Sequence, residues 1–482
     1  MWWSRSSPVH EDNYLRSATD VLHEGPNECR CIIREELDYY RTLVVGGIYE
    51  LSQPQDTASI FTFAPAIKQC IDAHAHLSAV ASATGSSSPY FVYCPQLDLT
   101  KHVEIRNHPL ENDENEVIKR LLPEILETKL PEGIPRWKAV VLPFSERRFF
   151  LAFAYSHGLL DGMSGMAFHR TFLDALQQAS RDNDHHGGSP ADLVHSSPFR
   201  PLPPPVDTKE NLPISWSFLL SPLLSLYLPA SFGFRASITT PTTWTGAPNL
   251  YEVDNFKTGL EMFSVDAVTV GHVLKACRAN GAKMTGLLHE LIAEAMLELL
   301  PEKYDTLVAQ TAINLRGALG IAAYEMGLCV GGDTDIIARS SESWMTARSV
   351  TTKLAAKSKN TKDQSVGLLR YLSDIRSWTL SRIGKGRGCS YELSNLMSFQ
   401  PVNTASTAGM KHMVFAQPAA ATGPPLSFNV VSAPGGPMTV TATWQLGAFD
   451  LESRADSETE FVEAVCQSVQ AALGRIAKDV LD

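Results

Sequence analysis

Residues 148–155 read R-F-F-L-A-F-A-Y, and the chain continues as S-H-G-L-L-D-G to residue 162. The first eight residues are almost all apolar, which predicts a buried β-strand. W-K-A-V-V-L-P-F at 137–144 predicts its partner strand, across the short turn 145–147. The strand stops beside His157, and a buried imidazole without a hydrogen-bond partner is costly. The position of His157 therefore needs an explanation.

The simpler explanation for the segment H-G-L-L-D-G is structural. M-S-G-M-A-F-H-R-T-F-L-D-A-L at 163–176 keeps apolar residues at helical spacing, and an acid before a helix is an ordinary N-cap. This explains Asp161 and Gly162 but leaves His157 unexplained. The functional explanation is that His157 is a general base, because imidazole titrates near neutral pH.

Strand and helix patterns alternate along the rest of the chain, which predicts an α/β fold with mixed sheets. Proline is expected to end or kink the helix that precedes Pro123. Strands are expected at 42–51, 90–94 and 306–316, with a hairpin at 426–432 and 438–444. Helices are expected at 66–81, 115–122, 163–176, 265–280, 285–300 and 461–477.

The length of 482 residues is too great for one compact core, so two lobes are expected. Composition changes at 180–213, which is rich in Ser, Pro, Asp, His and Gly and predicts an exposed linker or crossover. We therefore expect an N-terminal lobe at 1–182, a linker at 183–213 and a C-terminal lobe at 214–482. The apolar segment 214–234 contains two prolines, which favours a buried helical hairpin or lobe contact over an integral membrane span. Interfacial membrane attachment is the alternative for that segment.

The net charge of −11 argues against a nucleic-acid partner, because neutralising phosphates requires a basic face. It leaves room for a local basic pocket that binds one phosphorylated molecule. The eight cysteines form no C-x-x-C pair, which argues against a zinc ribbon or a redox motif. The opening M-W-W-S-R-S-S-P lacks the apolar core of a signal peptide. We expect a cytoplasmic protein with reduced thiols.

I-D-A-H-A-H-L at 71–77 matches the D-x-H-x-H string of zinc amidohydrolases. The surrounding apolar residues, however, recur at helical spacing. Residues two apart on a helix point in nearly opposite directions, so His74 and His76 could not chelate one metal ion. We expect His74 to face the core, His76 to face solvent, and neither to bind metal.

The chain resembles the chloramphenicol-acetyltransferase-like superfamily over most of its length. The resemblance begins in P-R-W-K-A-V-V-L-P-F and F-F-L-A-F-A-Y-S-H-G-L-L-D-G. It continues in order through W-T-G (244–246), C-R (277–278), I-N-L-R-G-A-L (313–319), L-S-N-L (393–396) and F-D (449–450). The superfamily includes plant BAHD acyltransferases, fungal alcohol acetyltransferases and peptide-synthetase condensation domains, and the fungal branch looks closest. Ser156 stands where condensation domains carry a second histidine, and the plant D-F-G-W-G motif is missing from the sequence.

This resemblance implies two chloramphenicol-acetyltransferase-like lobes with a tunnel between them. Acyl-CoA, acting as a co-substrate, would enter by one mouth and a small-molecule acceptor by the other; no bound cofactor is implied. The implied reaction is O-acyl transfer, with acetyl as the expected group, to a hydroxyl of a small hydrophobic natural product. An N-acyltransferase or a condensation-type enzyme is the alternative, and an inactive binding member of the fold is an alternative of another class. We expect a monomer.

The resemblance also assigns roles to residues. His157 would take the acceptor proton and then protonate the departing thiolate. Asp161 would hold the turn by pairing with an arginine, for which Arg316 is the candidate by position. Gly162 would let the backbone turn tightly under the histidine.

Two further functions need residues that the sequence offers only as candidates. Oxyanion stabilisation needs an aimed donor, and the candidates are Ser394, Asn395, Ser427 and Asn429. The phosphates of coenzyme A need a basic loop, and the candidates in S-R-I-G-K-G-R-G (381–388) are Arg382, Lys385 and Arg387.

Overall fold

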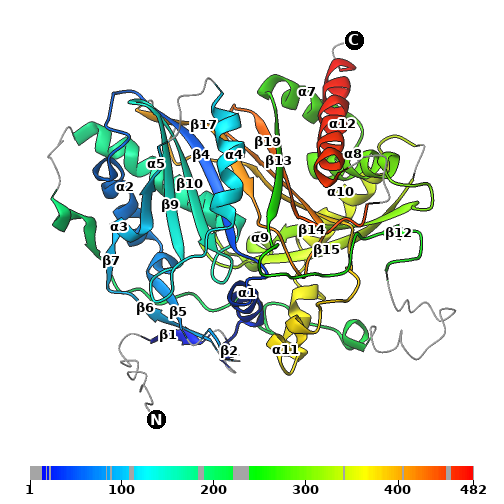
Figure 1. Cartoon of the computed structure of the whole chain (residues 1–482), viewed down its shortest axis with the longest axis horizontal. Coiled ribbons are helices and arrows are strands. Elements are labelled where there is room, and N and C mark those ends of the chain that lie inside the picture. The colour runs from blue at the N-terminus through cyan, green and yellow to red at the C-terminus, as the bar shows by residue number, and fades with distance from the viewer. Residues whose placement is uncertain are drawn as a thin grey trace.

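A computed structural model gives the fold of the chain. It describes residues 14–17, 19–20, 23–82, 84–86, 89–107, 113–182, 189–220, 238–339, 342–403, 407–451 and 457–480. Two large sheets with their covering helices lie side by side, and helix α1 (Pro26–Glu36) lies below the junction between them (Figure 1). The mixed α/β prediction is confirmed.

The first sheet has five strands in the order β17-β4-β10-β9-β8. Strand β10 is antiparallel to both of its neighbours, so the predicted strand pair of β9 and β10 is confirmed. The predicted strand at 42–51 is also confirmed, as β4. The strands are β4 (Thr42–Leu51), β8 (Val103–Ile105), β9 (Trp137–Ser145), β10 (Arg148–Ser156) and β17 (Ala408–Ala416).

Both faces of this sheet are covered, which explains why β10 is apolar without alternation. Phe149, Leu151 and Phe153 pack with residues of helices α2 (Ile60–Ala73) and α5 (Gly162–Asp182). Phe150 and Ala152 point the other way and pack with residues of α4 (Glu114–Leu126). The last residues of this central strand therefore lie inside the molecule, and His157 follows them directly.

Strand β17 comes from the second half of the chain, yet it pairs with β4 of the first half. Side chains also join it to the second sheet, because Thr441 Oγ1 donates to the carbonyl oxygen of Phe415 at 2.6 Å. The division at 1–182, 183–213 and 214–482 stays a prediction, and the first sheet is completed by a strand from beyond residue 214.

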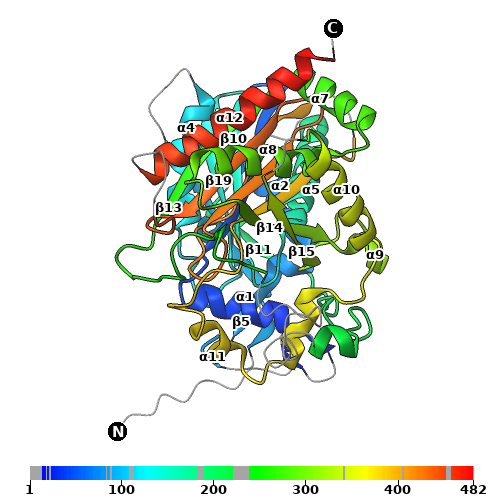
Figure 2. The ribbon, with the colours of Figure 1, turned by 90° about the vertical axis from the view of Figure 1, so that its right-hand side faces the viewer.

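The second sheet has seven strands, six in the order β12-β14-β16-β18-β19-β13, with β15 paired to β14. Helices α7, α8, α10 and α12 cover its outer face (Figure 2). The predicted hairpin is confirmed as the antiparallel pair of β18 and β19. The strands are β12 (Thr243–Trp244), β13 (Thr258–Val265), β14 (Thr306–Asn314), β15 (Val330–Ala338), β16 (Tyr391–Ser398), β18 (Leu426–Ser432) and β19 (Met438–Gln445). The helices are α7 (Ala267–Ala279), α8 (Met284–Leu299), α10 (Met345–Lys357) and α12 (Glu458–Lys478).

Smaller elements complete the described part of the chain. Strands β1, β6 and β5 form a three-stranded sheet, in which β6 corresponds to the strand predicted at 90–94. These elements are β1 (Tyr14–Ser17), β2 (Thr19–Asp20), β3 (His23–Glu24), β5 (Ala79–Ser82), β6 (Tyr90–Tyr93), α3 (Leu99–His102), α9 (Arg316–Leu319), η5 (Ser365–Tyr371) and α11 (Ile375–Leu380).

Two helix predictions were wrong in their extent. The helix expected at 66–81 begins earlier and ends at Ala73, because His74 adopts an extended backbone with φ −125° and ψ 104°. A short 3-10 turn, Ala75–Ser78, and strand β5 follow it. Helix α4 instead continues past Pro123 to Leu126. Proline near the end of a helix removes only one backbone hydrogen bond.

The predicted linker is anchored where the structure describes it, from residue 189 onward. Strand β11 (Val194–Ser196) pairs with β7 (Gln96–Asp98), and Leu202 and Leu212 are buried. The described part of this segment is therefore largely exposed but is anchored to the first half of the chain by a strand pair and by single buried side chains. Most of the segment predicted to form a buried hairpin, residues 221–234, lies outside the described residues.

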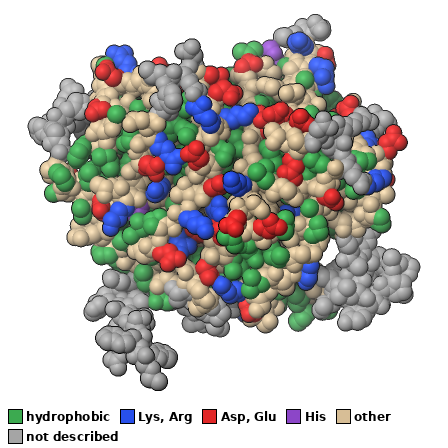
Figure 3. Space-filling model, viewed as in Figure 1, with side chains coloured by type: hydrophobic (Ala, Val, Ile, Leu, Met, Phe, Trp, Pro, Cys, Tyr) green, Lys and Arg blue, Asp and Glu red, His purple; other side chains and the backbone are tan. Residues whose placement is uncertain are grey.

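Charged side chains of both signs are interspersed on the face shown in Figure 3. Within the described ranges, the chain contains no helix that is both long enough and apolar enough to span a bilayer.

Candidate active site

The turn between β10 and α5 is fixed by hydrogen bonds that begin in the sequence motif itself. Asp161 Oδ1 accepts from Ser164 N and from Ser164 Oγ, each at 2.9 Å, as a residue that caps a helix does. Tyr155 Oη donates to the carbonyl oxygen of Asp161 at 2.9 Å. Asp161 therefore caps α5, as the structural explanation expects. Its ion pair with Arg316 gives it a second role.

Asp161 and Arg316 form a buried ion pair. The guanidinium donates to both carboxylate oxygens, at 2.7 and 2.9 Å, and the Arg316 side chain is 1% exposed. Cys329 N also donates to Asp161 Oδ2, at 3.0 Å. Burial alone would raise the pKa of Asp161, but the charge of Arg316 and its hydrogen bonds outweigh burial and lower it. The pair ties the motif to β14 and β15 of the second sheet.

His157 is oriented by its own turn. Its Nδ1 lies 2.7 Å from the carbonyl oxygen of Leu160, which can only accept, so Nδ1 carries the proton. Within the described part of the chain Nε2 makes no hydrogen bond, so its lone pair is available to accept a proton. Burial, together with the positive charges of Arg30 and Arg34, lowers the pKa of His157 to about 4. The imidazole is therefore neutral at physiological pH.

Gly162 is required by close packing. A Cβ at this position would lie 2.6 Å from Leu396 Cδ2 and 3.3 Å from the ring of Phe415. These two residues belong to the second half of the chain, so Gly162 lets β16 and β17 approach the start of α5. The tight turn under the histidine stays a prediction.

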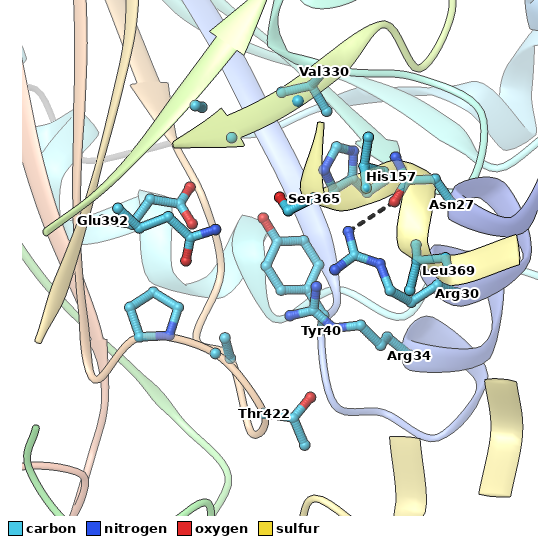
Figure 4. Close-up of a pocket in the computed structure, with 18 of the residues that line it drawn as sticks. Asn27, Arg30, Arg34, Tyr40, His157, Val330, Ser365, Leu369, Glu392 and Thr422 are labelled. Atoms are coloured by element: carbon cyan, nitrogen blue, oxygen red, sulfur yellow. Dashed lines mark hydrogen bonds between the residues drawn. The ribbon is translucent and has the colours of Figure 1, made fainter. Parts of the chain in front are cut away.

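His157 opens into a cavity of about 590 Å³ between the two halves of the molecule (Figure 4). Its wall carries both polar and apolar side chains. The lining residues come from α1, β14, β15, η5, α11, β16 and β18, and from the segments that follow α1, β10, η5 and β17. They are Asn27, Arg30, Arg34, Tyr40, His157, Gln310, Ala312, Val330, Gly331, Gly332, Ser365, Val366, Leu368, Leu369, Leu372, Trp378, Glu392, Gln417, Ala420, Thr422, Gly423, Pro424 and Ser427. A tunnel with two mouths stays a prediction.

The four oxyanion candidates lie in different places. Ser427 lines the cavity. Asn429 is fully buried and bonds to Gln417 and Thr441, at 2.8 and 3.2 Å. Asn395 bonds to Thr285 of α8 at 3.1 Å, and Ser394 is buried beside Asn429 in the neighbouring strand. Only Ser427 of the four shares the cavity with His157.

The three basic residues expected to bind phosphate have different surroundings. Arg387 points inward, where its donors are used by the carbonyl oxygens of Ala247 and Gly423, at 2.9 and 2.7 Å. This arginine holds one wall of the cavity in place. Arg382 lies over the ring of Trp378, and Lys385 is exposed. Phosphate binding by these two stays a prediction.

Sequence reasoning missed several polar residues of the cavity. Tyr40 Oη donates to Gln417 Oε1 at 2.7 Å, and Gln417 Nε2 donates to Glu392 Oε1 at 3.0 Å. Burial raises the pKa of Glu392. Arg30 and Arg34 were also missed, although their spacing of four residues in R-C-I-I-R places them on one face of a helix.

The histidines of D-A-H-A-H behave differently from the prediction. His76 is 5% exposed and buried, whereas the half-buried His74 bonds to Thr171 Oγ1 at 2.8 Å through Nε2. The prediction that His76 faces solvent was wrong, because the helix ends before both histidines and the helical spacing no longer applies. The described residues contain no cluster of three His, Cys, Asp or Glu side chains suited to a metal ion.

Comparisons with known proteins relate most of the chain to alcohol acetyltransferases. The alcohol acetyltransferase family model matches residues 103–465. The chain is 23% identical over 421 residues to "Probable alcohol acetyltransferase crmB" of Aspergillus fumigatus, which covers 78% of this chain and 84% of that one. It is 26% identical over 412 residues to "Probable alcohol acetyltransferase FCK4" of Fusarium pseudograminearum, which covers 79% of each chain.

Solved structures show the same fold. The trichothecene 15-O-acetyltransferase TRI3 of Fusarium sporotrichioides superposes with a TM-score of 0.65 at 13% identity, over 98% of this chain and 99% of that one. The first condensation domain of the CDA synthetase superposes with a TM-score of 0.58 at 14% identity, over 94% of this chain and 95% of that one.

Proposed function

The chain belongs to the alcohol acetyltransferase family, and from this premise we propose that it transfers an acetyl group from acetyl-CoA to a hydroxyl of a small hydrophobic molecule. His157 is the general base. The observation that carries this proposal is that His157 lines the cavity between the two halves while its Nδ1 is held by the Leu160 carbonyl oxygen, which leaves Nε2 as the nitrogen that can accept a proton.

The first step of this reaction is attack of the acceptor hydroxyl on the thioester carbonyl. The acceptor proton passes to His157 Nε2 as the new C–O bond forms. The hydrogen bond from Nδ1 to the Leu160 carbonyl becomes stronger when the imidazole is charged, and this offsets part of the cost of burying that charge. A neutral resting state keeps the lone pair available.

The second step breaks the C–S bond and releases the ester. The imidazolium returns its proton to the thiolate of coenzyme A, so no covalent enzyme intermediate is needed. An imidazolium with a lowered pKa gives up its proton readily. Ser427 is the candidate donor to the oxyanion because it lines the same cavity.

Asp161 and Arg316 take no part in proton transfer in this proposal. Both are buried, and neither lines the cavity. Their ion pair, together with the hydrogen bond from Cys329 N to Asp161, fixes the conformation of the turn after β10 and so the orientation of His157. They are positioning residues.

The proposed function can be tested by product analysis. Purified protein would be incubated with acetyl-CoA and a panel of hydrophobic alcohols and matched amines, and products would be identified by mass spectrometry. Alcohol-dependent formation of esters with release of coenzyme A is the expected result. Products formed only from amines would favour N-acylation, and no product with any acceptor would contradict the proposal.

A further inference from the structure

Two guanidinium groups enter the cavity from one face of α1. Arg30 and Arg34 both line it, and Figure 4 shows them on the same side as His157 and Tyr40. Both side chains are half-buried, and the Nε of each is buried without a hydrogen-bond acceptor in the described structure. Polar atoms held this way lose hydration without replacement, which is costly unless a ligand supplies the missing acceptor.

The two arginines differ in the contacts that their guanidinium groups make. Arg30 Nη2 donates to Asn27 Oδ1 at 2.8 Å. Arg34 rests on the ring of Tyr40, with its Cζ 4.4 Å from the ring centroid. Within the described residues, no carboxylate lies close enough to Arg34 to form an ion pair. Burial lowers the pKa of Arg34, and the positive charge of Arg30 lowers it further.

The one carboxylate that lines the cavity does not neutralise this pair. Glu392 is engaged by Gln417 at 3.0 Å, and burial raises its pKa. The lining therefore holds two positive groups against one carboxyl group that resists ionisation. An anionic ligand is the natural complement of this arrangement.

The position of Arg34 indicates which reactant carries the anion. The ring centroids of Tyr40 and His157 are 5.8 Å apart, and Arg34 Cζ lies 4.4 Å from the Tyr40 centroid, which places Arg34 within about 10 Å of the imidazole. The pantetheine arm between a thioester and the phosphates of coenzyme A extends roughly 14 Å, about the length of four extended residues. Phosphates of an extended donor therefore reach beyond Arg34.

We propose that Arg30 and Arg34 bind a carboxylate of the acceptor, so that the preferred acceptor is a hydroxy acid whose apolar body lies along the aliphatic wall. That wall includes Val366, Leu368 and Leu369. The inference rests on the proposed function for the hydroxyl that reacts, and it adds the chemical class of the molecule that carries this hydroxyl.

The test compares ω-hydroxydecanoate with its methyl ester, each with acetyl-CoA and purified protein. The wild-type chain should show a kcat/KM for the acid at least about tenfold above that for the ester. Arg34→Gln should raise KM for the acid relative to KM for the ester and so bring the ratio of the two kcat/KM values close to one, while KM for acetyl-CoA stays within about twofold. The ratio is the readout, because loss of the Arg34 charge near His157 affects the turnover of both acceptors alike. Arg34→Lys should restore part of the preference, because it restores the charge without the planar guanidinium.

Arg348→Gln is the matched control, since Arg348 forms an exposed ion pair with Glu342 and does not line the cavity. It should leave both substrates unaffected. Binding of decanoate, measured by calorimetry on the wild type and on Arg34→Gln, provides a readout that needs no turnover. Circular dichroism would check that each variant folds.

Equal turnover of acid and ester by the wild type would overturn the inference and leave the proposed function standing. A raised KM for acetyl-CoA in Arg34→Gln would overturn it in favour of a donor phosphate. If neither of these acceptors nor any alcohol of the panel reacted but decanoate still bound, and bound at least about tenfold more weakly to Arg34→Gln, the anion site would be supported and the proposed function would fail.

Discussion

The Asp161 carboxylate has two structural roles. Ser164, Cys329 and Arg316 all donate to it, so it caps α5 and joins that helix to the second sheet. Because it does not line the cavity, its loss should affect stability directly and chemistry only through the placement of His157.

Asp161→Asn should lower the free energy of unfolding by about 3–5 kcal/mol, because Arg316 would keep its buried charge without a counterion. Urea unfolding would measure this. In a double-mutant cycle with Arg316→Met, the coupling should be at least about 0.5 kcal/mol. The exposed pair Arg348–Glu342 is the control, worth about 0–1 kcal/mol. Strict additivity of the two buried substitutions would contradict the pairing.

The sequence supports prediction of some site residues and not of others. His157, Asp161 and Arg316 sit in motifs, so they could be named before the fold was known. Arg34 and Glu392 could not, because α1 and β16 are more than three hundred residues apart and only the closure of the cavity brings them together. For Arg387 the sequence pattern could not reveal the surroundings, since this one residue of an otherwise exposed glycine-rich loop turns inward to bond to the Gly423 carbonyl oxygen.

At the scale of elements, α5 packs unusually close to β4. A Cβ on Gly165 would lie 2.7 Å from Val45 Cβ and 3.0 Å from Tyr155 Oη. Tyr155 Oη is the group that bonds the Asp161 carbonyl. A glycine inside this helix is therefore explained by the approach of the strand, and any side chain there would push the motif out of place.

Gly165→Ala should destabilise the protein, although alanine usually stabilises a helix by about 1 kcal/mol over glycine. Gly271→Ala in α7 is the matched control, because nothing lies within 4 Å of its Cβ position. The control should raise the free energy of unfolding by about 0.5–1 kcal/mol. Thermal melting of both variants tests this, and a stabilised Gly165→Ala would show that the two elements are not tightly packed.

The extent of elements was predicted well where packing and local pattern agree. Strand β4 begins and ends where its apolar run does. Helix α2 was misplaced because apolar spacing continues across His74 into residues that belong to a turn and to β5. Local periodicity alone cannot reveal a backbone that becomes extended while its side chains stay apolar.

At the scale of the whole molecule, the two sheets are interlocked. Strand β17 completes the first sheet and bonds to the second, so the cavity is built from both halves and neither half supplies it alone. Strand order of this kind depends on long-range pairing, which the residue pattern of a single strand does not encode.

Stability should fall as the pH decreases from about 6.5 toward 4. Burial lowers the pKa of five histidines to between about 3 and 4, so the unfolded chain takes up protons in this range that the folded chain does not. These are His74, His157, His169, His289 and His412.

Each histidine contributes up to about 1.4 kcal/mol per pH unit. Asp207 acts in the opposite direction, because burial raises its pKa to about 7 and the folded chain holds that proton. Urea unfolding at pH 7, 6 and 5 measures the net slope of the free energy of unfolding against pH. His169→Gln should lower this slope by the contribution of one proton, up to about 1.4 kcal/mol per pH unit. A stability that stays constant or increases toward pH 5 would contradict buried neutral histidines.

The central claim is that His157 is the base, and the kcat of His157→Ala with acetyl-CoA and an acylated alcohol tests it most directly. Loss of a general base should lower kcat by at least about a hundredfold. The dissociation constant for acetyl-CoA should stay within about twofold of the wild type, since His157 acts on the thiolate only after the transfer and is not assigned to donor binding. A variant that kept wild-type kcat would contradict the account.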